Sequence, residues 1–170
     1  MLNAYSGRRA AQLRAMYRTG RGNRVARELA RLWAWVFAHT PLGRRWVTLE
    51  VAGRRSGAPR RFPLGMADLD GRWYLVSMLG ECAWVHNVRA AGGRAALLRG
   101  GQRRAVRLVE VDPGRRAPIL ARYVQTVPGG RPHIPVDPGS PVGEFAAVAD
   151  RYPVFEVRDQ SPSSAASAAR

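Results

Sequence analysis

A run of nine residues at positions 53–61, GRRSGAPRR, combines four arginines with a serine, a proline and two glycines. Guanidinium groups present forked N–H donors that match phosphate oxygens, and the hydroxyl of Ser56 adds a further polar group. Gly57 permits a positive φ and a close approach of the backbone to a ligand. The lysine and the glycine spacing of a Walker loop or a dinucleotide fingerprint are absent. The residue types therefore leave two interpretations open, a phosphate-binding loop and a solvated hairpin.

The other side chains that could do chemistry are scattered along the chain. His39, His86 and His133 have no partner at metal-ligand spacing, so the sequence predicts no metal site. His133 lies in a proline-rich segment and is a candidate for contacting substrate, and Tyr123 is a candidate proton donor with a core position as the alternative. The single cysteine, Cys82, excludes an intrachain disulfide and is more typical of a buried thiol than of a reactive one.

Strands flank the arginine-rich run. Alternating apolar residues predict strands at positions 46–52 and 62–66, on either side of it. An Asp-Gly pair at 70–71 and a Gly-Gly pair at 100–101 predict two further hairpins, and the run VFEV at 154–157 predicts a last strand. We therefore expect an α+β, mainly β fold, a small antiparallel split β-barrel of about six strands with an N-terminal helix and two or three short helices.

The N-terminal helix is predicted from residue 24 to about residue 39, because apolar residues recur at three- and four-residue steps and Pro41 disfavours helix just before it. Its apolar side, which includes Trp33 and Phe37, leaves two alternatives: packing on its own domain, or lying on an anionic membrane surface. Shorter helices are predicted near residues 83–91, 117–125 and 142–150, the last with Ser140 as its cap.

The length of 170 residues and the hydrophobic fraction of 46% fit one globular domain. We expect a flexible basic segment at 1–22, the barrel domain at 23–159, and a disordered Ser/Ala-rich tail at 160–170. No apolar run approaches the roughly 20 residues that span a bilayer. The expected location is cytoplasmic, either free or peripheral to the inner face of the membrane.

The net charge of +16 is concentrated toward the N-terminal side, because residues 1–61 hold fourteen arginines against two glutamates. Such a field attracts nucleic acid, an anionic membrane surface or a phosphorylated small molecule. All 28 basic residues are arginines, so codon composition is an alternative explanation for their number, although not for their clustering. Aromatic residues do not alternate with the arginines of the 53–61 run, so we expect no nucleic-acid partner.

The runs TLEVAGRRSGAPRRFPL, DLDGRWYLVSMLGE and AWVHNVRAAGGRAAL together resemble the deazaflavin-dependent nitroreductase family. Its members are split β-barrel oxidoreductases that use the reduced deazaflavin coenzyme F420. The resemblance covers about residues 46–111, and the ending YPVFEV also fits. The combination of a G-R-[KR]-S-G-x-P-R loop with a downstream W-x-x-N is its most specific part. The resemblance implies hydride transfer from the reduced coenzyme to an electron-poor acceptor such as an enone, a quinone or a nitro compound.

The same resemblance implies a cofactor site. The loop would grip the coenzyme's phosphate, the segment after the third strand would line the deazaflavin ring, and the following helix would approach it. The implied residues are Arg54, Arg55, Ser56, Gly57 and Arg60 in the loop, Ser77, Met78, Leu79 and Gly80 in the segment, and Trp84 and Asn87 on the helix. The segment SMLGECAW is shorter than in many members, and ARYVQTVPGGRPHIP has no clear counterparts of the tyrosines of nitroimidazole-reducing relatives.

Other functions stay open at this stage. Within the enzymes, the alternative is a split barrel that binds FMN or haem. Outside them, the chain could carry the coenzyme without turnover, or bind nucleic acid or an anionic membrane as a basic module. A homodimer is also compatible with the sequence.

Overall fold

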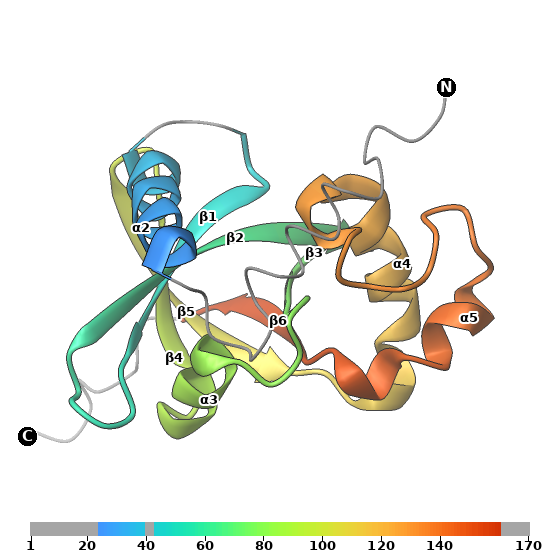
Figure 1. The fold of residues 1–170 in the computed structure, drawn as a ribbon. Coiled ribbons are helices and arrows are strands. Elements are labelled where there is room, and N and C mark those ends of the chain that lie inside the picture. Colours follow the sequence, from blue (N-terminus) through green and yellow to red (C-terminus); the bar gives the residue numbers. More distant parts are fainter. Residues whose placement is uncertain (1–23, 40–42, 161–170) are drawn as a thin grey trace, which may run out of the picture.

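Six antiparallel strands close into a barrel in the order β1-β2-β3-β6-β5-β4, which confirms the predicted fold class (Figure 1). The computed structural model describes residues 24–39 and 43–160, so the predicted segment 1–22 and residues 161–170 of the predicted tail lie outside it. The strands are β1 (Trp46–Ala52), β2 (Pro59–Leu69), β3 (Arg72–Val76), β4 (Arg94–Arg99), β5 (Gln102–Glu110) and β6 (Val154–Asp159). The α-helices are α2 (Arg24–His39), α3 (Ala83–Ala90), α4 (Ala117–Thr126) and α5 (Val142–Ala146).

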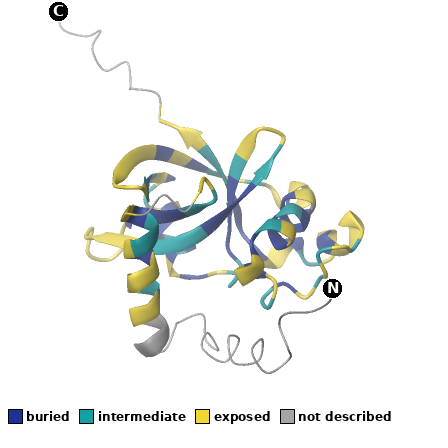
Figure 2. Cartoon of the chain, turned by 90° about the horizontal axis from the view of Figure 1, so that it is seen from above, coloured by how far each residue is buried: buried dark blue, intermediate teal, exposed yellow. Residues whose placement is uncertain are grey.

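The barrel interior is filled by alternate side chains of the strands. On β1, Val47, Leu49 and Val51 point inward and are at most 2% exposed. They pack with apolar residues of the other strands and of α3. Burial of each such side chain contributes about 1.5–3 kcal/mol, so this cluster is a main source of stability. Figure 2 shows buried positions along the strands and exposed ones on the outer sides of the helices.

Two-residue turns make the predicted hairpins. Leu69 pairs with Arg72 in the turn between β2 and β3, and both central residues have positive φ, 50° at Asp70 and 73° at Gly71. The turn between β4 and β5 has the same form, with two glycines at positive φ at positions 100–101. This backbone shape matches the twist of the paired strands, which is why Asp-Gly and Gly-Gly pairs predict it well.

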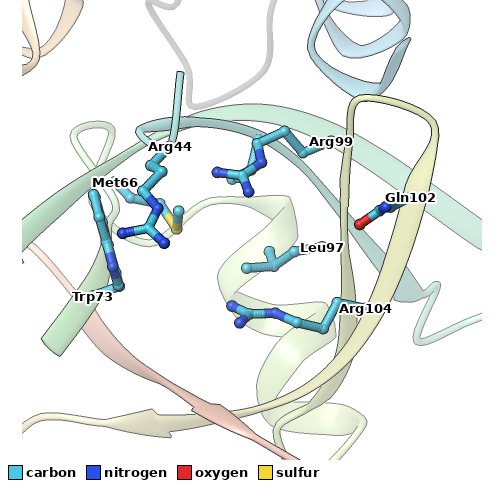
Figure 3. A pocket seen from close by; sticks show the side chains of 8 residues that line it. Arg44, Met66, Trp73, Leu97, Arg99, Gln102 and Arg104 are labelled. Atoms are coloured by element: carbon cyan, nitrogen blue, oxygen red, sulfur yellow. The ribbon is translucent and has the colours of Figure 1, made fainter. Parts of the chain in front are cut away.

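The two ends of the barrel differ. Both two-residue turns lie at the end where β1 begins, and there a pocket of about 370 Å³ opens into the barrel (Figure 3). At the other end, β1 leads into the arginine-rich loop and α3 lies close by. The barrel therefore has a pocket at one end and is covered by α3 at the other.

Helix α2 packs across β1, β2 and β4. Ala34 and Ala38 are 5% and 3% exposed, and the Thr48 hydroxyl donates a hydrogen bond to the Ala34 carbonyl. Trp33 and Trp35 are 49% and 61% exposed. The helix thus packs on its own domain through a narrow face and leaves two indoles accessible. Within the described residues, no helix is long and apolar enough to cross a membrane.

A second core lies outside the barrel, where α4 packs against β2 and β3 and α5 packs against α4, and Val154 of β6 joins the same cluster. Leu120 and Phe145 are fully buried there. The helix predicted to run to residue 150 is shorter, because α5 ends at Ala146 and a separate 3₁₀ turn follows. Its cap was also predicted wrongly: Pro141 stands at the N-cap and no side-chain cap bond forms, so Ser140 lies one residue too early.

Candidate functional site

The loop between β1 and β2 is held by its own backbone. The Gly53 N–H donates to the Ala58 carbonyl over 2.9 Å, and the Gly57 N–H donates to the Gly53 carbonyl over 2.8 Å. Gly57 has φ of +68°, a conformation in which a side chain would be strained. The loop shape is therefore set without its arginines, and Arg55 and Ser56 remain exposed.

Asn87 of α3 anchors this loop. Its Oδ1 accepts from the Arg54 backbone N–H at 3.3 Å and from Arg54 Nη1 at 3.2 Å. Two donors on one atom identify it as the amide oxygen. The side chain is 5% exposed, and its amide nitrogen has no hydrogen-bond partner among the described residues, so it is available to a ligand. Sequence reasoning predicted this residue for the site, but not that it would orient Arg54.

The arginines of the loop divide into two kinds. Arg61 Nε donates to Glu50 at 2.9 Å, and Arg103 Nε donates to the other oxygen of the same carboxylate at 2.9 Å. Burial raises the pKa of Glu50, but the hydrogen bonds from Arg103 and Arg61 outweigh burial, so its pKa lies below the ordinary value. By contrast, Arg55 and Arg60 form no ion pair with any carboxylate of the described residues, and neither does Arg54.

These unpaired arginines surround one pocket of about 310 Å³. The lining residues are Gly53, Arg54, Arg55, Ser56, Arg60, Phe62, Ala83 and Asn87. The structure thus brings four of the five predicted loop residues to one cavity together with Asn87. Phe62 and Ala83 were not predicted. In the sequence, Phe62 is only one of the alternating apolar residues of a predicted strand, and nothing places it beside α3.

The segment after β3 is a closed turn. The Ser77 hydroxyl, 1% exposed, donates to the Gly80 carbonyl at 2.6 Å and lies 3.3 Å from Cys82 Sγ. Met78 and Leu79 are half-buried and pack on the two apolar cores. The four residues predicted at the deazaflavin ring therefore lie at the same end of the barrel as the arginine-rich loop, but they do not line the arginine pocket. Their role at the ring stays a prediction.

Trp84 lies in the barrel core. It is 5% exposed, and its ring centroid is 5.4 Å from that of Phe155. Asn87 is three positions further along α3 and lines the pocket, as does Ala83 at the start of the helix. Trp84 was predicted to approach the ring with Asn87, and a role in cofactor binding stays a prediction, whereas its place in the core is observed.

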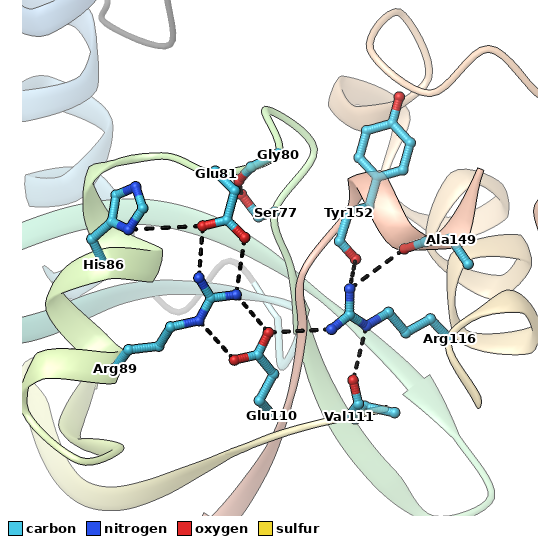
Figure 4. Close-up of polar contacts among 10 residues, drawn as sticks. All are labelled: Ser77, Gly80, Glu81, His86, Arg89, Glu110, Val111, Arg116, Ala149 and Tyr152. Atoms are coloured by element: carbon cyan, nitrogen blue, oxygen red, sulfur yellow. Dashed lines mark hydrogen bonds and ion pairs between the residues drawn. The ribbon is translucent and has the colours of Figure 1, made fainter. Parts of the chain in front are cut away.

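A chain of ion pairs fixes α3 on the barrel (Figure 4). Arg89 donates to Glu81 at 2.6 Å and to Glu110 at 2.7 and 2.8 Å. Arg116, 6% exposed, donates to the same Glu110 at 3.2 Å and to the Val111 carbonyl at 2.8 Å. The Arg89 hydrogen bond lowers the pKa of Glu110 against the opposing effect of burial. This network ties the helix that carries the loop's amide acceptor to the end of β5.

The two candidate catalytic residues do not line the arginine pocket. Tyr123 lies on α4 and is 3% exposed in the core, and burial raises its pKa above the ordinary value. His133 is half-buried, and its carbonyl accepts from the Tyr152 hydroxyl at 2.8 Å. Among the described residues, no three His, Cys, Asp or Glu side chains gather where they could hold a metal ion.

Comparison with known proteins supplies a family. A family model described as F420H(2)-dependent quinone reductase matches residues 27–132. A search of curated proteins found no match. A solved structure described as an F420-H2 dependent reductase is 23% identical over 68% of this chain and 95% of that chain, with a TM-score of 0.46.

Two further solved structures share the fold. A conserved hypothetical protein from Mycobacterium tuberculosis is 15% identical over 69% of this chain and 74% of that chain, with a TM-score of 0.51. A protein of unknown function from Agrobacterium tumefaciens is 14% identical over 79% of this chain and 55% of that chain, with a TM-score of 0.51.

Proposed function

Since the chain belongs to the F420H2-dependent quinone reductase family, we propose that the loop at residues 53–60 is the phosphate clamp of its deazaflavin coenzyme. The protein is a deazaflavin-dependent oxidoreductase. The proposed reaction is reduction of an electron-poor organic acceptor. A quinone is the first candidate, because the family's description names it, and enones and nitro compounds are the next.

One observation carries the proposal: Arg54, Arg55 and Arg60 surround a single pocket without a carboxylate partner among the described residues. Holding like charges together is unfavourable unless an anion compensates them. A phosphate offers several oxygens to forked guanidinium donors. The neighbouring Arg61 is already paired with Glu50, so the loop separates its ion-paired arginine from those available to a ligand.

The residues present fit this coenzyme. The two loop arginines Arg55 and Arg60 would bind the phosphate, Arg54 would be held in place by Asn87, and Phe62 would offer an apolar contact. When bound, the reduced deazaflavin supplies the hydride, and the protein supplies position, electrostatics and shelter from water. No side chain is needed as a nucleophile. Tyr123 is too buried to donate a proton at this pocket, so solvent is the simplest source.

The proposal is tested by binding of the oxidised coenzyme to the purified protein, followed by fluorescence. We expect Arg55→Ala and Arg60→Ala each to weaken binding about tenfold or more, because a hydrogen bond to a charged group contributes roughly 1.5–3 kcal/mol. FMN, titrated in parallel, tests the alternative cofactor. A deazaflavin that lacks the phosphate and tail should bind equally well to the wild type and to both variants.

Arg61→Ala is the matched control, since it removes the same charge from the next residue but breaks an existing ion pair with Glu50. We expect this variant to change coenzyme affinity by less than about threefold, because exposed charges contribute little individually. If the double variant Arg55→Ala/Arg60→Ala binds the complete coenzyme as tightly as the wild type, the loop is not the phosphate clamp. Tighter binding of FMN would instead favour a flavin-binding barrel.

A further inference from the structure

A second cluster of arginines lies at the opposite end of the barrel (Figure 3). Arg44 precedes β1, Arg99 ends β4 and Arg104 lies on β5, yet all three line one pocket of about 370 Å³. The floor of this pocket is apolar and includes Trp73 and Leu97. The cluster has no part in the proposed coenzyme site.

The charges of this pocket are poorly compensated. Arg104 Nη1 lies 3.1 Å from Asp159 Oδ1, in a pair whose side chains are 57% and 72% exposed. Arg44 and Arg99 have no carboxylate partner among residues 24–39 and 43–160. Three guanidinium groups from three separate segments of the chain therefore line this pocket, and of the three only Arg104 has a carboxylate partner among the described residues, which is exposed. Such convergence costs electrostatic energy that an anionic ligand would recover.

The floor adds a second kind of recognition. Leu97 is 4% exposed, and Trp73 is half-buried and exposes part of its indole to the pocket. The guanidinium carbon of Arg45 lies 5.7 Å from the centroid of the same indole, but its charge is already paired with Asp68 at 2.7 Å. Small-molecule sites commonly combine an apolar wall with a few convergent polar groups, and their volumes begin at roughly 300 Å³. A bare inorganic ion would leave the floor unused.

We propose that this barrel mouth binds the phosphate group of a phosphate ester whose organic part is small and apolar or aromatic. The arginines would bind the phosphate oxygens, and the organic part would lie on Trp73 and Leu97. The site is independent of the coenzyme clamp: β1 separates Val47 at this mouth from Gly53 at the other end, and six residues of strand span about 20 Å. Both sites can therefore be occupied at once.

The test uses the full chain in phosphate-free buffer, with phenyl phosphate and inorganic phosphate as probes. Binding is followed by ¹⁵N NMR, in which the Trp73 indole N–H reports on the barrel mouth and the Asn87 side-chain amide reports on the coenzyme pocket. We expect phenyl phosphate to move the Trp73 signal and to bind several-fold more tightly there than inorganic phosphate. Arg44→Ala/Arg99→Ala should weaken this binding tenfold or more.

Arg107→Ala/Arg115→Ala is the matched control, because it removes two exposed arginines that do not line this pocket. An equal loss of affinity in both double variants would reduce the effect to net charge and overturn the proposal. So would phenyl phosphate that moves only the Asn87 signal, or that moves neither. Trp73→Leu, with its melting temperature checked and binding followed by calorimetry, should lower the preference for the aryl ester and leave inorganic phosphate unchanged.

A phosphate ester can reach this mouth from solution or from a lipid headgroup, and vesicles distinguish the two sources. Vesicles of phosphatidylglycerol in phosphatidylcholine are compared with phosphatidylcholine alone. Binding to the anionic vesicles that is lost in Arg44→Ala/Arg99→Ala, but not in the control pair, identifies a headgroup as the source. The two double variants could instead weaken vesicle binding equally, while only Arg44→Ala/Arg99→Ala weakens binding of phenyl phosphate. That result identifies a soluble ester as the source.

Discussion

At the scale of single residues, the candidate site depends on one amide. Asn87 offers its oxygen to both the backbone and the side chain of Arg54, and its nitrogen stays available to a ligand. In the proposed site the residue would therefore have two roles that substitutions can separate. Removing the amide releases Arg54, whereas a carboxylate keeps an acceptor in place but adds negative charge to a pocket that is to hold an anion.

We predict that Asn87→Ala weakens coenzyme binding about threefold to tenfold, since one hydrogen bond contributes roughly 0.5–1.5 kcal/mol. Asn87→Asp should weaken it further, although Arg54 keeps its acceptor, because the carboxylate repels the phosphate. Fluorescence titration measures both affinities, and thermal unfolding checks that the variants fold. Tighter binding by the Asp variant than by the Ala variant would mean that orientation of Arg54, rather than charge in the pocket, dominates.

At the scale of elements, α4 is fastened to the barrel by one carboxylate on β2. Asp68 accepts from Arg45 at 2.7 Å and from Arg122 of α4 at 3.0 and 3.2 Å. The hydrogen bonds from Arg122 and Arg45 lower the pKa of Asp68 from 3.8 to about 2. In this range the unfolded chain binds more protons than the folded one. The stabilisation is therefore complete above about pH 4 and is lost as the pH falls toward 2.

We predict that Asp68→Asn destabilises the protein at neutral pH and that the difference from the wild type vanishes near pH 2. The pKa change would correspond to about 2.5 kcal/mol, but the carboxylate is 37% exposed. Solvent screening therefore reduces the expected loss to about 1 kcal/mol. Urea unfolding at several pH values measures it. Asp70→Asn is the control, because Asp70 lies two residues away and has no ion pair among the described residues. It should change the free energy of unfolding little, and a loss equal to that of Asp68→Asn would contradict this account.

The elements themselves were predictable where local rules decide them. The Asp-Gly and Gly-Gly turns, the end of α2 before Pro41 and the alternation of β1 all follow from the backbone conformations that those residues favour. The length of α5 did not follow, because the sequence has no proline or glycine that signals the break after Ala146.

The site was predictable only in part, for the same reason. The loop arginines share one short segment, so a phosphate interpretation needed no tertiary information. Arg61 is ion-paired and its loop neighbours are not, and this difference depends on Glu50 and Arg103, which come from other strands. Likewise, the burial of Ser77 and Trp84 depends on contacts with Cys82 and Phe155 that no spacing in the sequence reveals.

At the scale of the whole molecule, charge acts on stability and on binding in opposite ways. The chain carries 28 arginines against twelve acidic residues, a net charge of +16. Ion pairs neutralise some of the described arginines, including those at Glu50, Asp68 and Glu110. The excess positive charge repels itself in the folded state, and the same positive field would attract anions to the two proposed sites.

We therefore predict that sodium chloride stabilises the protein while it weakens coenzyme binding. Between about 20 and 300 mM salt the Debye length falls from roughly 20 Å to roughly 6 Å, so self-repulsion and attraction of the coenzyme are both screened. A gain of about 1 kcal/mol would raise the melting temperature by about 2–4 °C. Arg107→Gln/Arg115→Gln, which removes two exposed charges outside both pockets, should be more stable than the wild type at low salt and should respond less to added salt. A wild-type melting temperature that falls with salt would show instead that the ion pairs outweigh the excess positive charge.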